Sequence, residues 1–205
     1  MSDDTSKEIS KYKQDNIIKY GLISSNENNI NVKEIFTSYF KTLHEDKYKI
    51  KRENHYEFKT PNFPNLTISI VISSLKKIIE IYSIFNFFIL FIDMEDSKVP
   101  EFLDKTIDTI VSKGDNCFNK KFYILGFYSE NKKVITKEKT TIIIEAKGID
   151  YYFTEIKKDE NMNNKFKNTI ELIVNDSNTI MLEKFLDQKH SELIPDNSKS
   201  NCIIA

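Results

Sequence analysis

Short apolar segments that alternate with amphipathic stretches constrain this chain more than any other feature of its sequence. Residues 87–92 are apolar throughout, as in a strand covered on both faces of a parallel sheet. In the stretch 99–110, apolar side chains recur three or four residues apart, which is typical of a helix packed on a sheet. Parallel strands need long crossover connections, which helices usually supply. The alternation therefore predicts an α/β fold with helices on both faces of a mostly parallel sheet.

The same reading extends along the chain. The turn at 61–64, with a proline at each end, joins two strand-like stretches without a helix between them, which predicts a hairpin and one antiparallel edge strand. The expected architecture is a three-layer α/β sandwich. Strands are expected at 17–23, 48–59, 66–72, 87–92, 122–127 and 151–154, and helices at 32–43, 75–82, 99–110, 136–147 and 162–174, with 180–185 extending or following the last helix.

The length of 205 residues suits a single domain. We expect it to span 16–187, between a polar, flexible N-terminus at 1–15 and a flexible tail at 188–205. The longest apolar stretch, 84–92, is far shorter than the roughly 20 residues of a membrane-spanning helix. With 30 basic and 31 acidic side chains, the chain has no overall field that would attract nucleic acid.

The two cysteines and three histidines of the sequence lie too far apart for a disulfide framework or a structural zinc site. No metal site is therefore expected. Cys117 is interpreted as a small buried apolar residue.

The groups that bind a nucleoside triphosphate are missing where such a fold would place them. The segment 21–29, after the first strand, has Gly21 but lacks the second glycine, the lysine and the hydroxyl of a phosphate-binding loop. Glu27 in this segment would repel a triphosphate. The segments after the third and fifth strands, 70–75 and 125–130, lack the Asp-x-x-Gly and Asn-Lys-x-Asp patterns for metal and guanine. The sequence therefore predicts no catalytic residue, no cofactor and no enzymatic activity.

The second half of the chain resembles a Ras-superfamily GTPase. The resemblance lies in 88–93, 122–126, 148–155 and the helix at 166–174, and through apolar pattern and element order it covers about 16–175. The stretch 152–157 is similar to the base-contacting loop of that family, without its Ser-Ala-Lys core. The resemblance implies a small-GTPase architecture. Combined with the missing nucleotide motifs, it implies a pseudo-GTPase that serves as a protein-interaction module.

Among pseudo-GTPases, the layout is similar to the centromere protein M family of inner-kinetochore subunits, which keep the fold and bind no nucleotide. The segment 117–125, which leads into the fifth strand, carries part of this similarity. It implies a role in kinetochore assembly and chromosome segregation, a location at centromeres in the nucleus, and kinetochore subunits as partners. It implies no direct contact with nucleic acid. No local motif identifies which residues would contact a partner.

The last four residues, Cys202-Ile203-Ile204-Ala205, form a C-a-a-X ending whose alanine favours farnesylation of Cys202. Chance is the alternative explanation, because this chain is rich in isoleucine. A single prenyl group anchors a protein only weakly and reversibly. The ending gives an alternative function, a prenylated Rab- or Ras-like adaptor in trafficking or signalling at the cytoplasmic face of membranes.

Three other sets of residues admit two interpretations each. The acidic residues Asp93, Glu95 and Asp96 after the fourth strand could bind a cation, but a capping role at the next helix is favoured. The lysine pairs could form a basic patch, but a solvated surface is favoured because acidic residues flank them. These pairs are 76–77, 120–121, 132–133 and 157–158. A third such set is the tyrosines and phenylalanines, which could stack on nucleic-acid bases, but they lie mostly at core spacing, so we expect them to pack inside.

Overall fold

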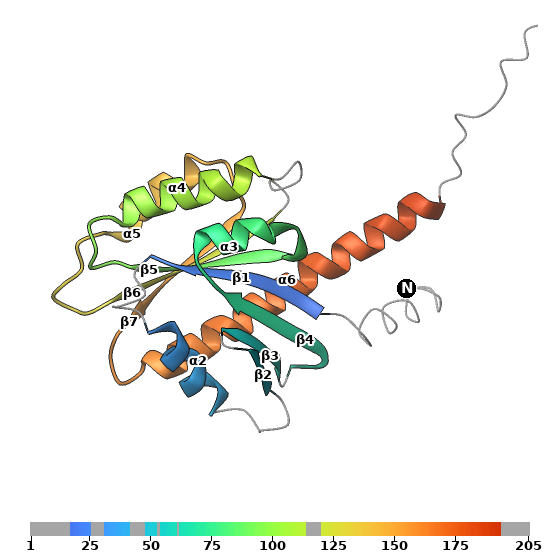
Figure 1. The fold of residues 1–205 in the computed structure, drawn as a ribbon, viewed down its shortest axis with the longest axis horizontal. Coiled ribbons are helices and arrows are strands. Elements are labelled where there is room, and N and C mark those ends of the chain that lie inside the picture. The colour runs from blue at the N-terminus through green and yellow to red at the C-terminus, as the bar shows by residue number, and fades with distance from the viewer. Residues whose placement is uncertain are drawn as a thin grey trace, which may run out of the picture.

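The computed structural model confirms the α/β fold class. It describes residues 17–25, 31–41, 48–52, 54–60, 62–113 and 120–193. Figure 1 shows the central sheet with helices on both faces. The strands are β1 (Ile17–Ser24), β2 (Tyr48–Arg52), β3 (His55–Thr60), β4 (Phe63–Ile72), β5 (Phe87–Asp93), β6 (Phe122–Tyr128) and β7 (Tyr151–Lys157). The helices are α2 (Val32–Phe40), α3 (Leu75–Glu80), the 3-10 turn η2 (Tyr82–Ile84), α4 (Val99–Ser112), α5 (Lys137–Glu145) and α6 (Met162–Leu193).

The sheet has seven strands in the order β2-β3-β4-β1-β5-β6-β7. Strands β4, β1, β5, β6 and β7 pair in parallel, and β3 runs antiparallel to both β4 and β2. The antiparallel pairing is therefore confined to one edge, as the sequence predicts. Five parallel strands end at the same side of the sheet, which we call the carboxyl edge.

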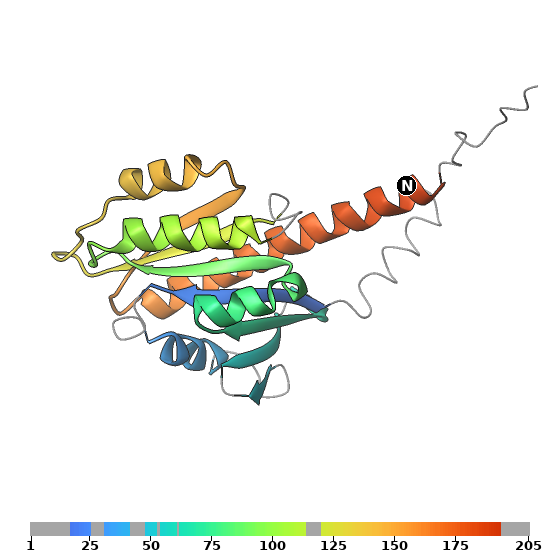
Figure 2. The same cartoon turned by 45° about the horizontal axis from the view of Figure 1, so that its top comes forward.

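Two apolar clusters fill the spaces between the sheet and its helices. One cluster joins α2 and α6 to the face of the sheet that carries Tyr20 and Phe91. The other joins α3, α4 and α5 to the opposite face, which carries Phe88 and Leu90. Figure 2 shows α4 and α5 at the top of the view, across the sheet from the blue α2. The two clusters make this a three-layer sandwich, and β5 is buried along its whole length because both faces are covered.

Aromatic side chains form much of the first cluster, as their spacing in the sequence predicts. The Phe36 ring stacks on Tyr56 and meets the edge of Phe166, with ring centroids 5.6 Å and 5.3 Å apart. The Phe40 ring stacks on Tyr48 at 5.0 Å. These contacts join α2 to the hairpin β2–β3 and to α6. Large planar side chains therefore fix where α2 lies on the sheet.

The stretch 48–59, which the sequence predicts as one strand, is two strands. Asn54 has a φ of +68°, in the left-handed region where asparagine is better tolerated than most residues. The chain reverses there, and Arg52 of β2 lies opposite His55 of β3. A second reversal follows before β4, which begins at Phe63 rather than at Leu66. The sheet thus gains an edge strand, β2, that the apolar pattern does not reveal.

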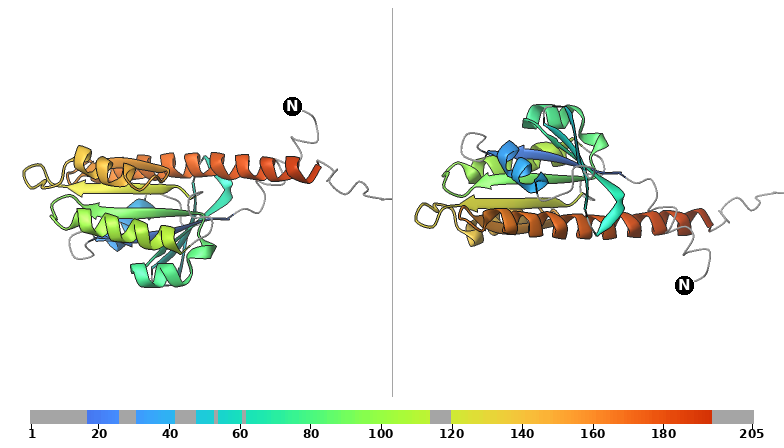
Figure 3. Two further views of the ribbon diagram at one scale, coloured as in Figure 1. Left: turned by 90° about the horizontal axis from the view of Figure 1, so that it is seen from above. Right: turned by 90° about the horizontal axis from the view of Figure 1, so that it is seen from below.

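The last helix is longer than predicted, because α6 runs as one helix from Met162 to Leu193. It therefore continues past Gln188, where the sequence places the start of a flexible tail; residues 194–205 and 1–16 lie outside the described part. Figure 3 shows the C-terminal half of α6 extending well beyond the sheet. Within the described residues, no helix combines the length and apolar character that a membrane-spanning segment needs.

Candidate functional site at the carboxyl edge

The ends of β1, β4 and β5 are tied together by backbone and hydroxyl groups. The amide of Ser25 donates to the carbonyl of Phe91, with nitrogen and oxygen 2.8 Å apart, and the amide of Ser73 donates to the carbonyl of Leu22. The Ser25 hydroxyl oxygen accepts a hydrogen bond from the Asp93 amide at 3.0 Å. In a parallel sheet this edge is where ligands bind. Here the amide groups of Ser25, Ser73 and Asp93 bond to the protein itself.

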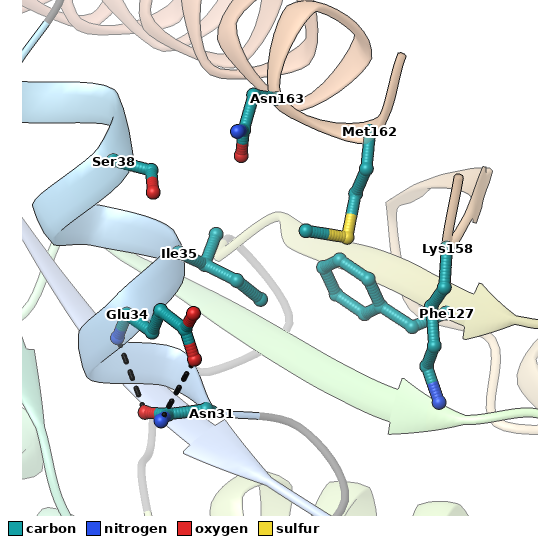
Figure 4. Close-up of a pocket in the computed structure, with 8 residues that line it drawn as sticks. All are labelled: Asn31, Glu34, Ile35, Ser38, Phe127, Lys158, Met162 and Asn163. Atoms are coloured by element: carbon teal, nitrogen blue, oxygen red, sulfur yellow. Dashed lines mark hydrogen bonds between the residues drawn. The ribbon is translucent and has the colours of Figure 1, made fainter. Parts of the chain in front are cut away.

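The N-terminus of α2 is capped by its own side chains. The Asn31 side-chain oxygen accepts from the amide of Glu34, and the Asn31 side-chain nitrogen donates to the Glu34 carboxylate, both at 3.1 Å. Figure 4 shows these two bonds as dashed lines. A helix N-terminus attracts anions through its free amides and its positive dipole end. Asn31 occupies one of those amides, and the Glu34 carboxylate places a negative charge in the first turn.

Lys158 joins the ends of three strands through two acidic side chains. Its ammonium nitrogen lies 3.1 Å from the Glu95 carboxylate and 3.4 Å from the carboxylate of Asp93, which is fully buried. The same oxygen of Glu95 accepts from the amide and the hydroxyl of Ser129, each at 2.8 Å. Asp93 ends β5, Ser129 follows β6 and Lys158 follows β7. We call these four residues the ionic cluster.

The electrostatics of the ionic cluster favour a charged Glu95. Burial alone would raise the pKa of Glu95, but hydrogen bonds from Ser129 and Lys158 outweigh it and bring the pKa below the ordinary value of 4.5. The cluster holds two carboxylates and one ammonium, so its formal charge is negative. A negative cluster at this edge disfavours an anionic ligand such as a polyphosphate.

The three acidic residues at the end of β5 do not cap α4 in the predicted way. Within the described residues, no group of three or more ligand-type side chains could hold a metal ion. The residue before α4 is Lys98, which makes no side-chain capping bond. Asp96 does accept from the Lys98 amide at 2.9 Å and so shapes the turn that leads into α4. Asp93 and Glu95 belong instead to the ionic cluster.

A pocket of about 290 Å³ opens beside the ionic cluster, between the first turns of α2 and α6. Figure 4 shows Ile35, Phe127 and Met162 on its apolar side, with Lys158 and Glu34 at opposite ends. The two charged ends already have partners, because Lys158 bonds to Glu95 and Glu34 bonds to Asn31. The pocket is thus an apolar hollow with internally paired charges.

A second hollow of about 370 Å³ lies at the ends of β1 and β4. It is the more polar one, with Lys33 and Lys77 among its lining residues, and the buried Ser24 hydroxyl has no hydrogen-bond partner in the part of the chain that the structure describes. None of the three described glycines lines it. Close approach of backbone amides to a phosphate normally depends on glycine. The described residues therefore lack the glycine cradle of a nucleotide site.

The described glycines have structural explanations instead. A Cβ at Gly21 would lie 3.1 Å from the Phe85 ring, and one at Gly126 would lie 2.5 Å from the Met94 sulfur. Gly148 follows α5 with a φ of +62°, a conformation that ends helices and favours glycine. These positions lie inside strands or at a helix end.

Most of the paired lysines are structural, which corrects the interpretation of a solvated surface. Lys120 donates to the carbonyls of Tyr82 and Phe85. Lys121 lies 2.9 Å from Asp176, Lys133 lies 2.6 Å from Glu155, and Lys157 lies 2.9 Å from Glu130. Lys76, Lys77 and Lys132 are exposed. Two of the pairs, 120–121 and 157–158, border strand ends, and that position was the available signal for a structural role.

The remaining sequence candidates divide between the described and the undescribed parts of the chain. Cys202, the predicted prenylation site, and Cys117 lie outside the described residues, so prenylation stays a prediction. His55 is described, and its Nε2 lies 3.0 Å from the Ser69 hydroxyl.

No protein-family model matches this chain, and no curated protein is detectably similar to it in sequence.

Proposed function

We propose that this chain is a non-catalytic pseudo-GTPase that acts as a protein-interaction module. The element order supports the small-GTPase architecture: strand, helix, antiparallel hairpin, and then alternating helices and strands. The placement of α2 and α6 on one face and of α3, α4 and α5 on the other is consistent with it. We thus extend the resemblance found in the sequence to the arrangement of the helices and strands in space.

The observation that carries the proposal is the ionic cluster together with the capped start of α2. Lys158, directly after β7, is engaged by Asp93 and Glu95 at the ends of β5, β6 and β7. Glu34 puts a further negative charge where a phosphate would meet the helix. Both features use groups at the carboxyl edge, where a nucleotide would bind, to stabilise the fold.

Binding of guanine nucleotides tests the non-catalytic part of this proposal. The purified chain is titrated with a fluorescent GTP analogue and Mg²⁺, and a bona fide small GTPase serves as the positive control. We expect no saturable signal into the hundreds of micromolar range. Saturable binding at micromolar concentration that unlabelled GTP competes away would overturn the proposal.

We further propose that the module serves the inner kinetochore, by the similarity to the centromere protein M family. The test is the location of a chain tagged at its N-terminus, with a centromere marker in the same cells. Foci that coincide with the marker are the expected result. A signal confined to vesicles or other membranes would contradict this role and favour the prenylated adaptor instead.

A further inference from the structure

Strand β7 presents an open edge of the sheet. It pairs with β6 and with no other strand of the described chain. The carbonyl of Asp150 accepts from the Phe122 amide, and the Lys158 amide donates to the Tyr128 carbonyl. Because parallel strands direct alternate residues toward a neighbour, the even-numbered residues of β7 face β6. The amides and carbonyls of Tyr151, Phe153, Glu155 and Lys157 therefore point away from the sheet.

This edge has few of the features that usually protect an edge strand, and its one central charge, Glu155, is paired with Lys133. The opposite edge, β2, is five residues long and carries the exposed Lys49 and Lys51, both of which discourage pairing. Strand β7 has seven residues, no proline and no lysine before its last position, and its aromatic side chains are only half-buried. A strand of this kind is a template for further pairing.

Apolar surface continues from the β7 edge onto α6. A small, mostly apolar pocket of about 160 Å³ lies between them, lined by Tyr123, Tyr152 and Ile173. Leu172 also lines it, and its side chain is 56% exposed. At the same place, the ion pair of Lys121 and Asp176 neutralises the charges near the pocket. An exposed leucine beside a neutral pocket and an open strand favours protein contact.

We propose that two copies of this chain pair through β7, antiparallel, around a two-fold axis that passes through Thr154. This register brings all four outward-facing residues into use, because Tyr151 then lies opposite Lys157 and Phe153 lies opposite Glu155. It satisfies the free amides and carbonyls of both edges at once. It also joins the two seven-stranded sheets into one.

Charge favours a second copy as the occupant. Asp150 precedes β7 and is 63% exposed, whereas Lys157 ends the strand and pairs, among the described residues, only with Glu130, which is itself 74% exposed. Antiparallel pairing brings the acidic start of each strand beside the basic end of the other. No like charges lie directly opposite in this register, and a symmetric interface repeats each favourable contact. The two α6 helices then lie on the same face, with Leu172 toward the axis.

A matched pair of variants at Glu155 tests the proposal. Both Glu155→Pro and Glu155→Ala remove the carboxylate that pairs with Lys133. Only the proline removes the outward amide, and proline is tolerated where an edge strand faces solvent. The full chain and each variant are measured by sedimentation velocity from micromolar to hundreds of micromolar. We expect a concentration-dependent dimer for the wild type and E155A, and a monomer for E155P.

Leu172→Glu gives a second test that leaves the backbone of β7 unchanged. We expect the dimer dissociation constant to rise about tenfold or more, because a charge replaces apolar surface at the interface. Ile142→Glu, at an exposed isoleucine on α5, is the control and should leave the dimer dissociation constant unchanged. Amide exchange of β7 should slow with concentration in the wild type and E155A, and not in E155P. A wild-type monomer at all concentrations, or an E155P dimer as stable as that of E155A, would overturn the proposal.

Discussion

At the scale of single residues, Lys158 has the largest structural role at the carboxyl edge. Its side chain is 24% exposed, whereas the Asp93 side chain that it neutralises is completely buried. A buried carboxylate is tolerable in a folded protein only with a charged or hydrogen-bonding partner. The sequence places Lys158 next to Lys157, and only the fold shows that Lys158 meets a buried carboxylate whereas Lys157 meets the exposed Glu130.

Replacing Lys158 by methionine should lower the free energy of unfolding by roughly 2–4 kcal/mol, because Asp93 and Glu95 lose their cation. Urea unfolding followed by circular dichroism measures the change. Lys157→Met is the matched control, and it should cost clearly less than the Lys158 substitution, since its partner Glu130 is 74% exposed. Equal effects of the two substitutions would contradict the role assigned to the ionic cluster.

The lowered pKa of Glu95 predicts a pH dependence of stability. A carboxyl group whose pKa falls on folding binds protons less readily in the folded state, so it stabilises the fold above its ordinary pKa of 4.5. That contribution disappears as the pH falls through the folded pKa. We therefore expect Glu95→Gln to be less stable than the wild type at neutral pH, with a smaller loss of stability on acidification. Urea midpoints between neutral pH and pH 3 or so test this; identical slopes would refute it.

At the scale of elements, the turn after α5 and the turn before β3 depend on backbone conformation rather than on apolar pattern. Both Gly148 and Asn54 have positive φ angles. The expected helix at 136–147 ends directly before Gly148, because glycine marks such positions. The sequence does not reveal the reversal at Asn54, because asparagine is common in this chain and therefore carries little information at any one position.

Substituting Gly148 by alanine should destabilise the fold by about 1 kcal/mol, because alanine tolerates a positive φ poorly. No atom lies within 4 Å of the added Cβ, so the cost is conformational and not steric. Gly148→Asn should cost less, since asparagine adopts this conformation more readily. Thermal unfolding of both variants measures the difference. An alanine variant as stable as the wild type would show that the turn relaxes.

Helix α6 shows why element lengths were harder to predict than element types. Its apolar stripe is interrupted at Ser177 and Asn178, which are polar yet buried. The Ser177 hydroxyl lies 2.7 Å from the hydroxyl of Tyr123, which also donates to Asp176 at 2.8 Å. Burial raises the pKa of Tyr123, so its hydroxyl remains protonated as a donor. A polar contact with β6 thus replaces an apolar one, and periodicity alone cannot reveal it.

At the scale of the whole molecule, burial explains why the fold class could be predicted. Residues 87–92 of β5 are apolar throughout because both faces of the strand are covered, and helices such as α4 carry one apolar stripe because one side is covered. The candidate site follows different rules. Lys158, Glu95 and Ser129 are far apart in sequence, and their meeting depends on how β5, β6 and β7 are ordered in the sheet.

The extension of α6 beyond the sheet determines where anything joined to its far end can act. At about 1.5 Å per residue, its 32 residues give a rod of roughly 48 Å. The seven residues of β7, at about 3.3 Å each, span only half that distance. The helix starts at the carboxyl edge and leads away from it, so its end and that edge can engage two different binding partners without a clash.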